Sequence, residues 1–284
     1  MRTTTGTLPV TGASLYYEVR GSGPTLLMIS PGLGDCGFYT RVADLLADTY
    51  QVVTYDRRGN SRSSLDNPED DLDVAVQSED ARQVLAEAGT SPAHVFGGSG
   101  GAIVGLDLAA SHPDLVRTLV AHEPPVVTLL PDGAERVAFF DEVYDIYRRE
   151  GIMAAMTTFE ASYREVAQEL DLEPDLPEPE LPERMHGNFD YFLAHEMRQF
   201  VRYQPDLGSL AGFAAGGRRL VLGGGIASRA GYPYLCGVAL HERLGEGRSE
   251  FREFEGDHAG YLTRPTGFAA GLRAVLAGER EPAA

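Results

Sequence analysis

Residues 94–113 read HVFGGSGGAIVGLDLAASHP, and this stretch decides the fold. Its first residues form a short apolar run typical of a buried strand, and the residues after Ser99 have the apolar pattern of a helix. The letters GGSGG around Ser99 satisfy the pattern G-x-S-x-G, in which small residues permit a sharp strand-to-helix turn. Such a turn lifts the serine hydroxyl above the edge of the sheet and directs the helix N-terminus toward it. We therefore predict Ser99 as a nucleophile and the Gly100 amide as an oxyanion donor.

A glycine-rich turn of this kind can also bind a phosphate, which is the alternative interpretation. A dinucleotide site has G-x-G-x-x-G after the first strand and an acidic residue about twenty positions later. Here the glycines follow the strand expected at 94–98, which is not the first strand of the chain. A P-loop needs a lysine, and all 24 basic residues of this chain are arginine. The pattern therefore favours the catalytic serine.

Apolar runs alternate with amphipathic stretches along most of the chain. We expect strands at residues 13–19, 25–30, 50–55, 94–98, 117–122, 218–222 and 249–254. We expect helices at residues 36–48, 73–88, 100–111, 232–244 and 266–277. This alternation predicts an α/β fold with a mostly parallel sheet flanked by helices.

Residues 126–207 break the alternation, because they contain long helical patterns and no convincing strand. We predict a core made of residues 1–125 and 208–284, with a helical cap inserted between its two parts. The insertion is rich in phenylalanine and tyrosine. Packing within the cap explains most of these side chains, and we expect some of them to line an apolar pocket for a small-molecule substrate.

Three further stretches strengthen the interpretation: TLLMISPGLGD at 25–35, QVVTYDRRGNSRS at 51–63 and FEGDHAGY at 254–261. Together with the GGSGG turn, they resemble the α/β-hydrolase fold superfamily, and the chain looks like a capped, esterase-like member. The resemblance implies that His258 is the general base. It also implies a second oxyanion donor in the loop after the strand at 25–30. Gly32 is the expected donor and Leu33 the alternative.

The third member of the triad is not where the family most often has it. In the commonest pattern an aspartate follows the strand expected at 218–222, but the loop GGGIASRAGY holds no carboxylate, and Ala227 or Ser228 occupies the position. Some members instead carry the acid after the strand that follows the nucleophile helix, and that residue here is Glu123. We predict Glu123 as the acid. The alternative is that Glu123 pairs with an arginine at the cap hinge, while His258 is held by backbone groups or by Ser228.

The loop that carries Asp56, Arg57 and Arg58 resembles a family loop with a mainly structural role. Its arginines could alternatively bind an acidic group of a substrate. Asp35 is expected to cap the next helix.

The net charge of −18 disfavours nucleic acids and anionic membranes as partners. Two distant cysteines, the absence of a signal-like N-terminus and the lack of a long apolar run predict a soluble cytoplasmic protein. We expect no organic cofactor and no metal. The oligomeric state is left open, a homo-oligomer included.

These features together predict a serine hydrolase that cleaves a carboxylic ester, lactone or thioester through an acyl-enzyme. A serine nucleophile argues against epoxide hydrolase and haloalkane dehalogenase chemistry, which use an aspartate at this position of the fold. Three alternatives stay open: a non-hydrolytic enzyme (acyl transfer, cyclisation or C–C cleavage), a cofactor-free oxygenase or peroxidase, and a non-catalytic ligand-binding protein.

Overall fold

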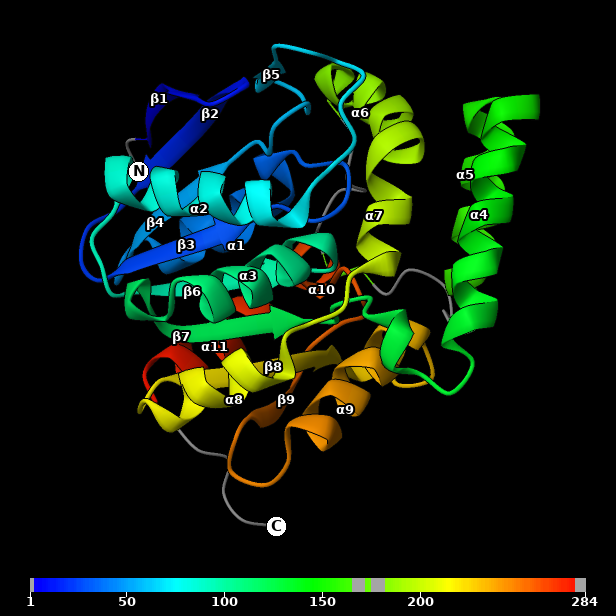
Figure 1. The fold of residues 1–284 in the computed structure, drawn as a ribbon. Helices are drawn as coiled ribbons and strands as arrows, with labels where there is room; N and C mark the ends of the chain where they lie inside the picture. The colour runs from blue at the N-terminus through cyan, green and yellow to red at the C-terminus, as the bar shows by residue number, and fades with distance from the viewer. Residues whose placement is uncertain (1–2, 165–171, 175–181, 279–284) are drawn as a thin grey trace.

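A nine-stranded sheet forms the centre of the computed structural model, which describes residues 3–164, 172–174 and 182–278 (Figure 1). The strand order is β1-β2-β4-β3-β6-β7-β8-β9, and β5 pairs with β2. The strands of this described part are β1 (Thr3–Val10), β2 (Ala13–Arg20), β3 (Thr25–Ile29), β4 (Gln51–Tyr55), β5 (Ser64–Leu65), β6 (Ala93–Gly98), β7 (Val116–His122), β8 (Arg219–Gly225) and β9 (Glu250–Phe254). Only the pairings made by β2 are antiparallel. The predicted α/β fold with a mostly parallel sheet is confirmed.

Strand β3 shows why the interior of the sheet reads as a continuous apolar run. Leu27 and Ile29 belong to the core on one face, and Leu26 and Met28 to the core on the other. All four side chains are fully buried. Burial of each side chain contributes about 1.5–3 kcal/mol, so packing on both faces of the sheet stabilises β3.

Helices cover both faces of the sheet. One face packs against α2, α3, α8 and α9, and the other against α1, α10 and α11 (Figure 1). Their bounds are α1 (Thr40–Leu46), α2 (Val74–Ala88), α3 (Gly100–Ser111), α8 (Leu207–Ala215), α9 (Tyr232–Leu244), α10 (Gly260–Thr263) and α11 (Pro265–Leu276).

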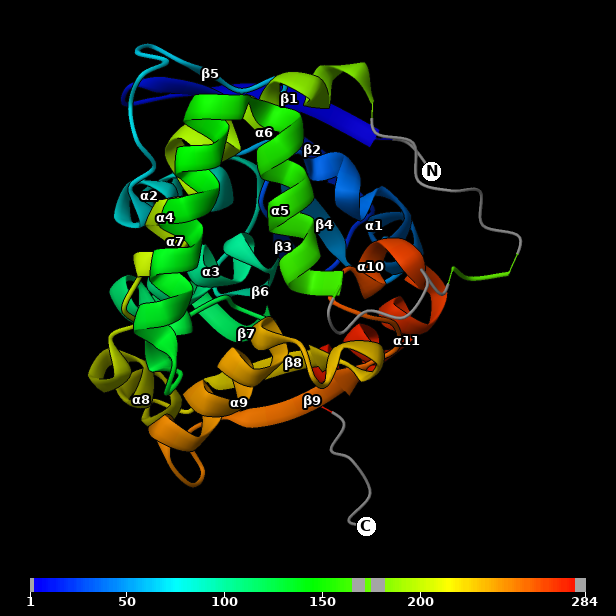
Figure 2. The same ribbon diagram turned by 90° about the vertical axis from the view of Figure 1, so that its right-hand side faces the viewer.

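A second group of helices lies between β7 and α8 in the chain, beyond the carboxyl ends of the parallel strands (Figure 2). These helices are α4 (Gly133–Glu150), α5 (Ile152–Arg164), α6 (His186–Tyr191) and α7 (Met197–Arg202). A π-helical turn, Phe192–Glu196, joins α6 to α7. Parts of the predicted cap, residues 165–171 and 175–181, lie outside the described residues.

The differences from the expected elements are local. The helix expected at 36–48 begins as a 3₁₀ turn, Cys36–Tyr39, before α1, and the Asp35 carboxylate accepts the Gly37 N–H at 2.6 Å. Strand β1 and helix α8 were not predicted, because β1 is a half-exposed edge strand and two glycines weaken the helical signal of α8. No helix of the described ranges is both long and apolar enough to cross a bilayer.

Candidate active site

Ser99 occupies the sharp turn between β6 and α3. Its backbone has φ 52° and ψ −122°, a region that residues other than glycine rarely adopt, and such strain costs about 1–3 kcal/mol. The Ser99 N–H donates to the His122 carbonyl at 2.9 Å, and its own carbonyl accepts the Ala102 N–H at 2.9 Å. The turn is therefore held by hydrogen bonds to β7 on one side and to the first turn of α3 on the other.

The glycines that flank Ser99 are required by close backbone contacts. A Cβ at Gly97 would collide with the Gly101 carbonyl, and a Cβ at Gly101 would collide with the Ile29 carbonyl. Both obstacles are backbone atoms, so neither can be moved as a side chain can. The sequence pattern thus corresponds to real steric limits on the turn.

We predict that Gly97→Ala lowers the free energy of unfolding by about 1–3 kcal/mol and displaces the Ser99 turn, because the new methyl group overlaps a carbonyl. The matched control is Gly212→Ala on α8, where a Cβ meets nothing within 4 Å. That control should be stabilised by about 0.5–1 kcal/mol. Urea unfolding of both variants gives the comparison. Equal stability of Gly97→Ala and the wild type would contradict the steric argument.

Strained backbone marks the carboxyl ends of the central strands. Among the described residues, four residues other than glycine have positive φ: Leu33, Ser61, Ser99 and Glu123. They follow β3, β4, β6 and β7 respectively. Strained residues persist where the surrounding structure fixes them, and they concentrate at functional sites. The carboxyl edge of the sheet is therefore the candidate site.

Glu123 and His258 meet at this edge. His258 Nδ1 lies 2.7 Å from Glu123 Oε2. The other carboxylate oxygen of Glu123 accepts the Gly225 N–H at 2.8 Å and a hydrogen bond from the Ser228 hydroxyl. Gly225 is the last residue of β8 and Ser228 lies in the turn that follows, so the carboxylate is held at the end of β8, where the resemblance most often places the acid. Glu123 does not pair with an arginine in the described structure, as one alternative required.

The Glu123 carboxylate is fully buried yet ionised. Burial alone would raise its pKa, but hydrogen bonds from His258 and Ser228 and the electrostatic influence of the His258 and His122 imidazoles lower the pKa below its usual 4.5. A lowered pKa in the folded state stabilises the fold at every pH above the unfolded-state value. That stability is lost as the pH falls through the folded-state pKa.

We therefore expect Glu123→Gln to lower the free energy of unfolding by about 1–3 kcal/mol at pH 7. The difference from the wild type should shrink as the pH falls below about 4.5, because the Glu123 carboxyl is protonated first in the unfolded chain and, at lower pH, in the folded protein. Urea unfolding at several pH values between 7 and 3 measures it. A difference that stays constant over this range would show that ionisation of Glu123 does not contribute to stability.

The predicted oxyanion residues lie beside the nucleophile. Gly32, Leu33, Ser99, Gly100 and His258 all line one cavity of about 250 Å³. Its remaining walls are almost entirely apolar and come mainly from the helices beyond the strand ends: Pro31, Phe38, Pro125, Phe140, Met156, Phe159, Phe192, Met197, Phe200, Val201, Tyr232 and Tyr261. The structure thus brings every predicted site residue together, with Glu123 behind His258.

The arginines of the loop after β4 do not line this cavity. Arg58 forms a two-pronged ion pair with Asp80 at 2.6 and 2.7 Å. Arg57 is fully buried and forms a similar pair with Glu196 at 2.6 and 2.9 Å. Both guanidinium groups are occupied by carboxylates of the protein, which argues against the alternative that they bind an acidic substrate group.

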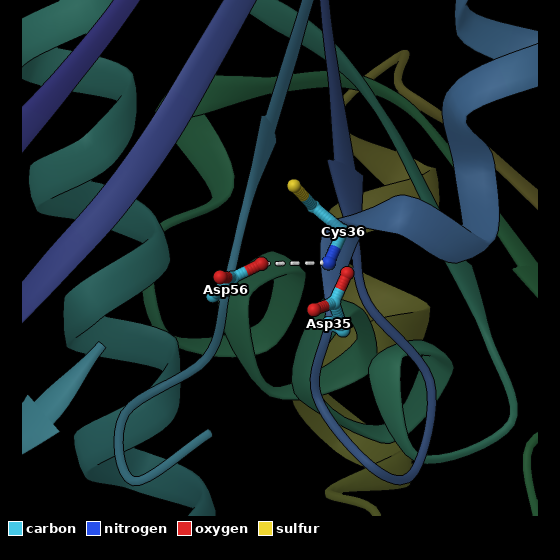
Figure 3. Close-up of side chains that lie close together, drawn as sticks. All are labelled: Asp35, Cys36 and Asp56. Atoms are coloured by element: carbon cyan, nitrogen blue, oxygen red, sulfur yellow. Dashed lines mark hydrogen bonds between the residues drawn. The ribbon is translucent and has the colours of Figure 1, made fainter. Parts of the chain in front are cut away.

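Asp35, Cys36 and Asp56 lie close together, with potential ligand atoms within 4.8 Å of one another (Figure 3). Arg62 contacts both oxygens of Asp56 at 2.6 and 2.9 Å, and Arg184 contacts both oxygens of Asp35 at 2.7 and 2.9 Å. Burial raises the pKa of the Cys36 thiol, which keeps it protonated. The carboxylates are already neutralised by guanidinium groups, so this cluster does not favour a metal ion.

Sequence reasoning missed two residues of the helical group that contact loops at the carboxyl edge of the sheet. Asn188 donates to the Leu33 carbonyl at 2.6 Å, and Glu196 binds Arg57. They are 155 and 139 residues away from these partners in the chain. No local pattern links such distant positions.

Comparison with known proteins agrees with the fold. Residues 24–201 match the model of the alpha/beta hydrolase fold family. The chain is 37% identical over 279 residues to the uncharacterized hydrolase YraK of Bacillus subtilis, with 97% of each chain covered. It is 30% identical over 181 residues to the zearalenone hydrolase of Cladophialophora bantiana, with 63% of each covered. Among solved structures, an α/β hydrolase from Sphaerobacter thermophilus superposes with a TM-score of 0.67 at 22% identity, covering 96% of this chain and 99% of that one.

The chain therefore belongs to the α/β-hydrolase fold family. Its relatives place it among the hydrolases of this fold.

Proposed function

We propose that this protein is a serine hydrolase that cleaves a carboxylic ester, lactone or thioester through an acyl-enzyme on Ser99. The observation that carries the proposal is that Ser99 and His258 line the same cavity, while Glu123 is bonded to His258 from outside that cavity. A strained serine, a histidine and a buried carboxylate in this arrangement form a triad. The relative named as a zearalenone hydrolase supports hydrolysis as the reaction.

The proposed reaction has two halves. Glu123 binds Nδ1 of His258, so Nε2 is the nitrogen that takes the proton of Ser99 as Oγ attacks the substrate carbonyl. The carbonyl oxygen becomes an oxyanion that accepts hydrogen bonds from the Gly100 and Gly32 amides. His258 then gives its proton to the leaving group, and the C–O or C–S bond breaks. Water, deprotonated by His258, attacks the acyl-enzyme and releases the acid and Ser99.

The cavity favours an uncharged, apolar substrate. Of the described residues that line it, His258 has the one basic side chain, and none is an aspartate, glutamate or arginine. A charged group placed among the phenylalanines and methionines of the wall would lose its hydration without gaining a partner. The helical group at 126–207 acts as a cap that supplies this wall.

The first test labels the protein with a fluorophosphonate. The wild type should be labelled and should hydrolyse p-nitrophenyl esters with apolar acyl groups, whereas Ser99→Ala should lose both properties, with activity reduced by about 10³-fold or more. Labelling and turnover that do not depend on Ser99 would refute the proposed function.

The second test concerns the acid. Glu123→Gln should lower kcat by about 10²–10⁴-fold, because a glutamine amide no longer stabilises the imidazolium that forms during attack. Its circular dichroism spectrum at pH 7 should match that of the wild type. If Glu123→Gln keeps near-normal turnover, then Glu123 is not the third member of the triad.

A further inference from the structure

Arg57 binds the loop after β3 from behind. Its Nε donates to the carbonyl of Ser30 at 3.1 Å and to that of Pro31 at 3.3 Å, and its Nη2 donates to the Pro31 carbonyl at 3.0 Å. The same guanidinium group binds Glu196 through Nη1 and Nη2. The side chains of Arg57 and Glu196 have no exposed surface. One buried charge pair thus connects the loop after β3 to the π-helical turn of the helical group.

Stability alone does not account for this pair. Removing two charges from water costs several kcal/mol per ion, and apolar side chains of similar volume often stabilise a protein equally well. Nε, Nη1 and Nη2 of the rigid guanidinium fork all donate hydrogen bonds at once, which no apolar pair can imitate. The geometry that it imposes on the loop is therefore the property to explain.

The geometry of the peptide bond shows what Arg57 controls. In a trans peptide the carbonyl and the following N–H point in opposite directions. The Pro31–Gly32 peptide is trans, since Ser91–Pro92 is the cis bond recorded among the described residues. Arg57 holds the Pro31 carbonyl toward the protein interior, so the Gly32 N–H points away from Arg57. Gly32 lines the cavity together with Ser99, and Arg57 does not.

The partner of Arg57 lies on the same segment as the cavity wall. Glu196 ends the π-helical turn that begins at Phe192, and Met197 and Phe200 follow it on α7. Phe192, Met197 and Phe200 all line the cavity. A second hydrogen bond, from Asn60 Nδ2 to Glu196 Oε1 at 3.1 Å, fixes the carboxylate. The wall of the cavity and the backbone of Gly32 are therefore held by one group of buried polar contacts.

We propose that Arg57 and Glu196 are a positioning pair that orients the Gly32 N–H as an oxyanion donor and connects this donor to the substrate-binding wall. The inference rests on the proposed serine-hydrolase function. Neither side chain touches the substrate. Their effect is exerted through the Pro31–Gly32 peptide, and it should be felt in the transition state, where the oxyanion forms, and not in substrate binding.

The test replaces both charges at once with Arg57→Met/Glu196→Met, which keeps the volume and leaves no unpaired buried charge. The matched control is Arg58→Met/Asp80→Leu, which removes the neighbouring buried ion pair; the hydrogen bonds of Arg58 go to Asp80 and the Thr11 carbonyl, outside the loop after β3. Loss of one oxyanion donor lowers kcat by about 10²–10³-fold. The Arg57/Glu196 variant should lose kcat by about this factor with little change in KM, and the control should keep kcat within about threefold of the wild type. Equal kcat losses in the two variants would overturn the proposal.

Two inhibitors distinguish a specific effect on the Gly32 N–H from a general loss of order in the cavity. An alkyl boronic acid adds to a serine hydroxyl as a tetrahedral anion, whereas the corresponding alcohol binds the cavity uncharged. Arg57→Met/Glu196→Met should weaken the boronic acid by about the factor lost in kcat and leave the affinity for the alcohol nearly unchanged. An equal loss for both ligands would mean a structural role only and would overturn the proposal.

Two further measurements keep the outcome decisive. If the double variant does not fold, Arg57→Lys replaces it, because a lysine cannot bind Glu196 and both carbonyls with one fork. Its ratio of boronic-acid to alcohol affinity should fall relative to the wild type, and an unchanged ratio would overturn the proposal. Wild-type protein and Ser99→Ala are measured alongside. A wild type without Ser99-dependent turnover would refute the serine-hydrolase function itself, which is a distinct result from an active wild type with an unaffected Arg57 variant.

Discussion

The parallel pairing of β3, β6, β7 and β8 is the constraint on which the site depends. Parallel strands end at the same edge, so the loops that follow them meet there although they are far apart in the chain. The loop with the proposed oxyanion donor Gly32 follows β3, Ser99 follows β6, and Glu123 follows β7. Ser228, which binds the Glu123 carboxylate, follows β8. The chain turns sharply within a few residues of the ends of β3, β6 and β7. Positive φ at Leu33, Ser99 and Glu123 is the local cost of these turns.

Glu123, the proposed acid, follows one strand, and its carboxylate is held by groups of the neighbouring strand and the turn after it. Glu123 lies on the strand next to the one that usually carries the acid in this family. Its carboxylate nevertheless receives hydrogen bonds from Gly225, at the end of β8, and from Ser228, in the turn after β8. A glutamate is one methylene longer than an aspartate, and this length allows the carboxylate to reach across to the neighbouring loop. Displacement of the acid along the sequence therefore leaves the proposed triad chemistry intact.

Polar contacts connect the helical group to the loops at the carboxyl edge of the sheet. Arg57 forms a buried ion pair with Glu196, Arg184 pairs with the buried Asp35, and Asn188 donates to the Leu33 carbonyl. These contacts converge on residues 30–35, which carry the proposed second oxyanion donor. In each of them one partner lies in the helical group and the other in a loop at the carboxyl edge. The apolar wall and the polar backbone of the site are therefore aligned by the same interface.

The sequence by itself determined most elements of the core and predicted Ser99 as the nucleophile. Local patterns carried this information: apolar runs for β3 and β6, amphipathic spacing for α2, and the GGSGG turn whose glycines avoid backbone collisions. The edge strand β1 and the glycine-containing helix α8 have weak local patterns, and neither element was predicted. The position of His258 and the choice of Glu123 came from the order of motifs along the chain together with the family resemblance.

Only the tertiary structure decided how these residues are held. The hydrogen bond between Glu123 and His258, the hydrogen bond from Ser228 to Glu123, and the pairing of Arg57 with Glu196 join residues separated by 105 to 139 positions. Such contacts depend on which strands are neighbours and on where the helical group docks, and both are set by packing of the whole chain. A local pattern indicates whether a segment prefers helix, strand or turn. It does not indicate which distant group will neutralise a buried charge.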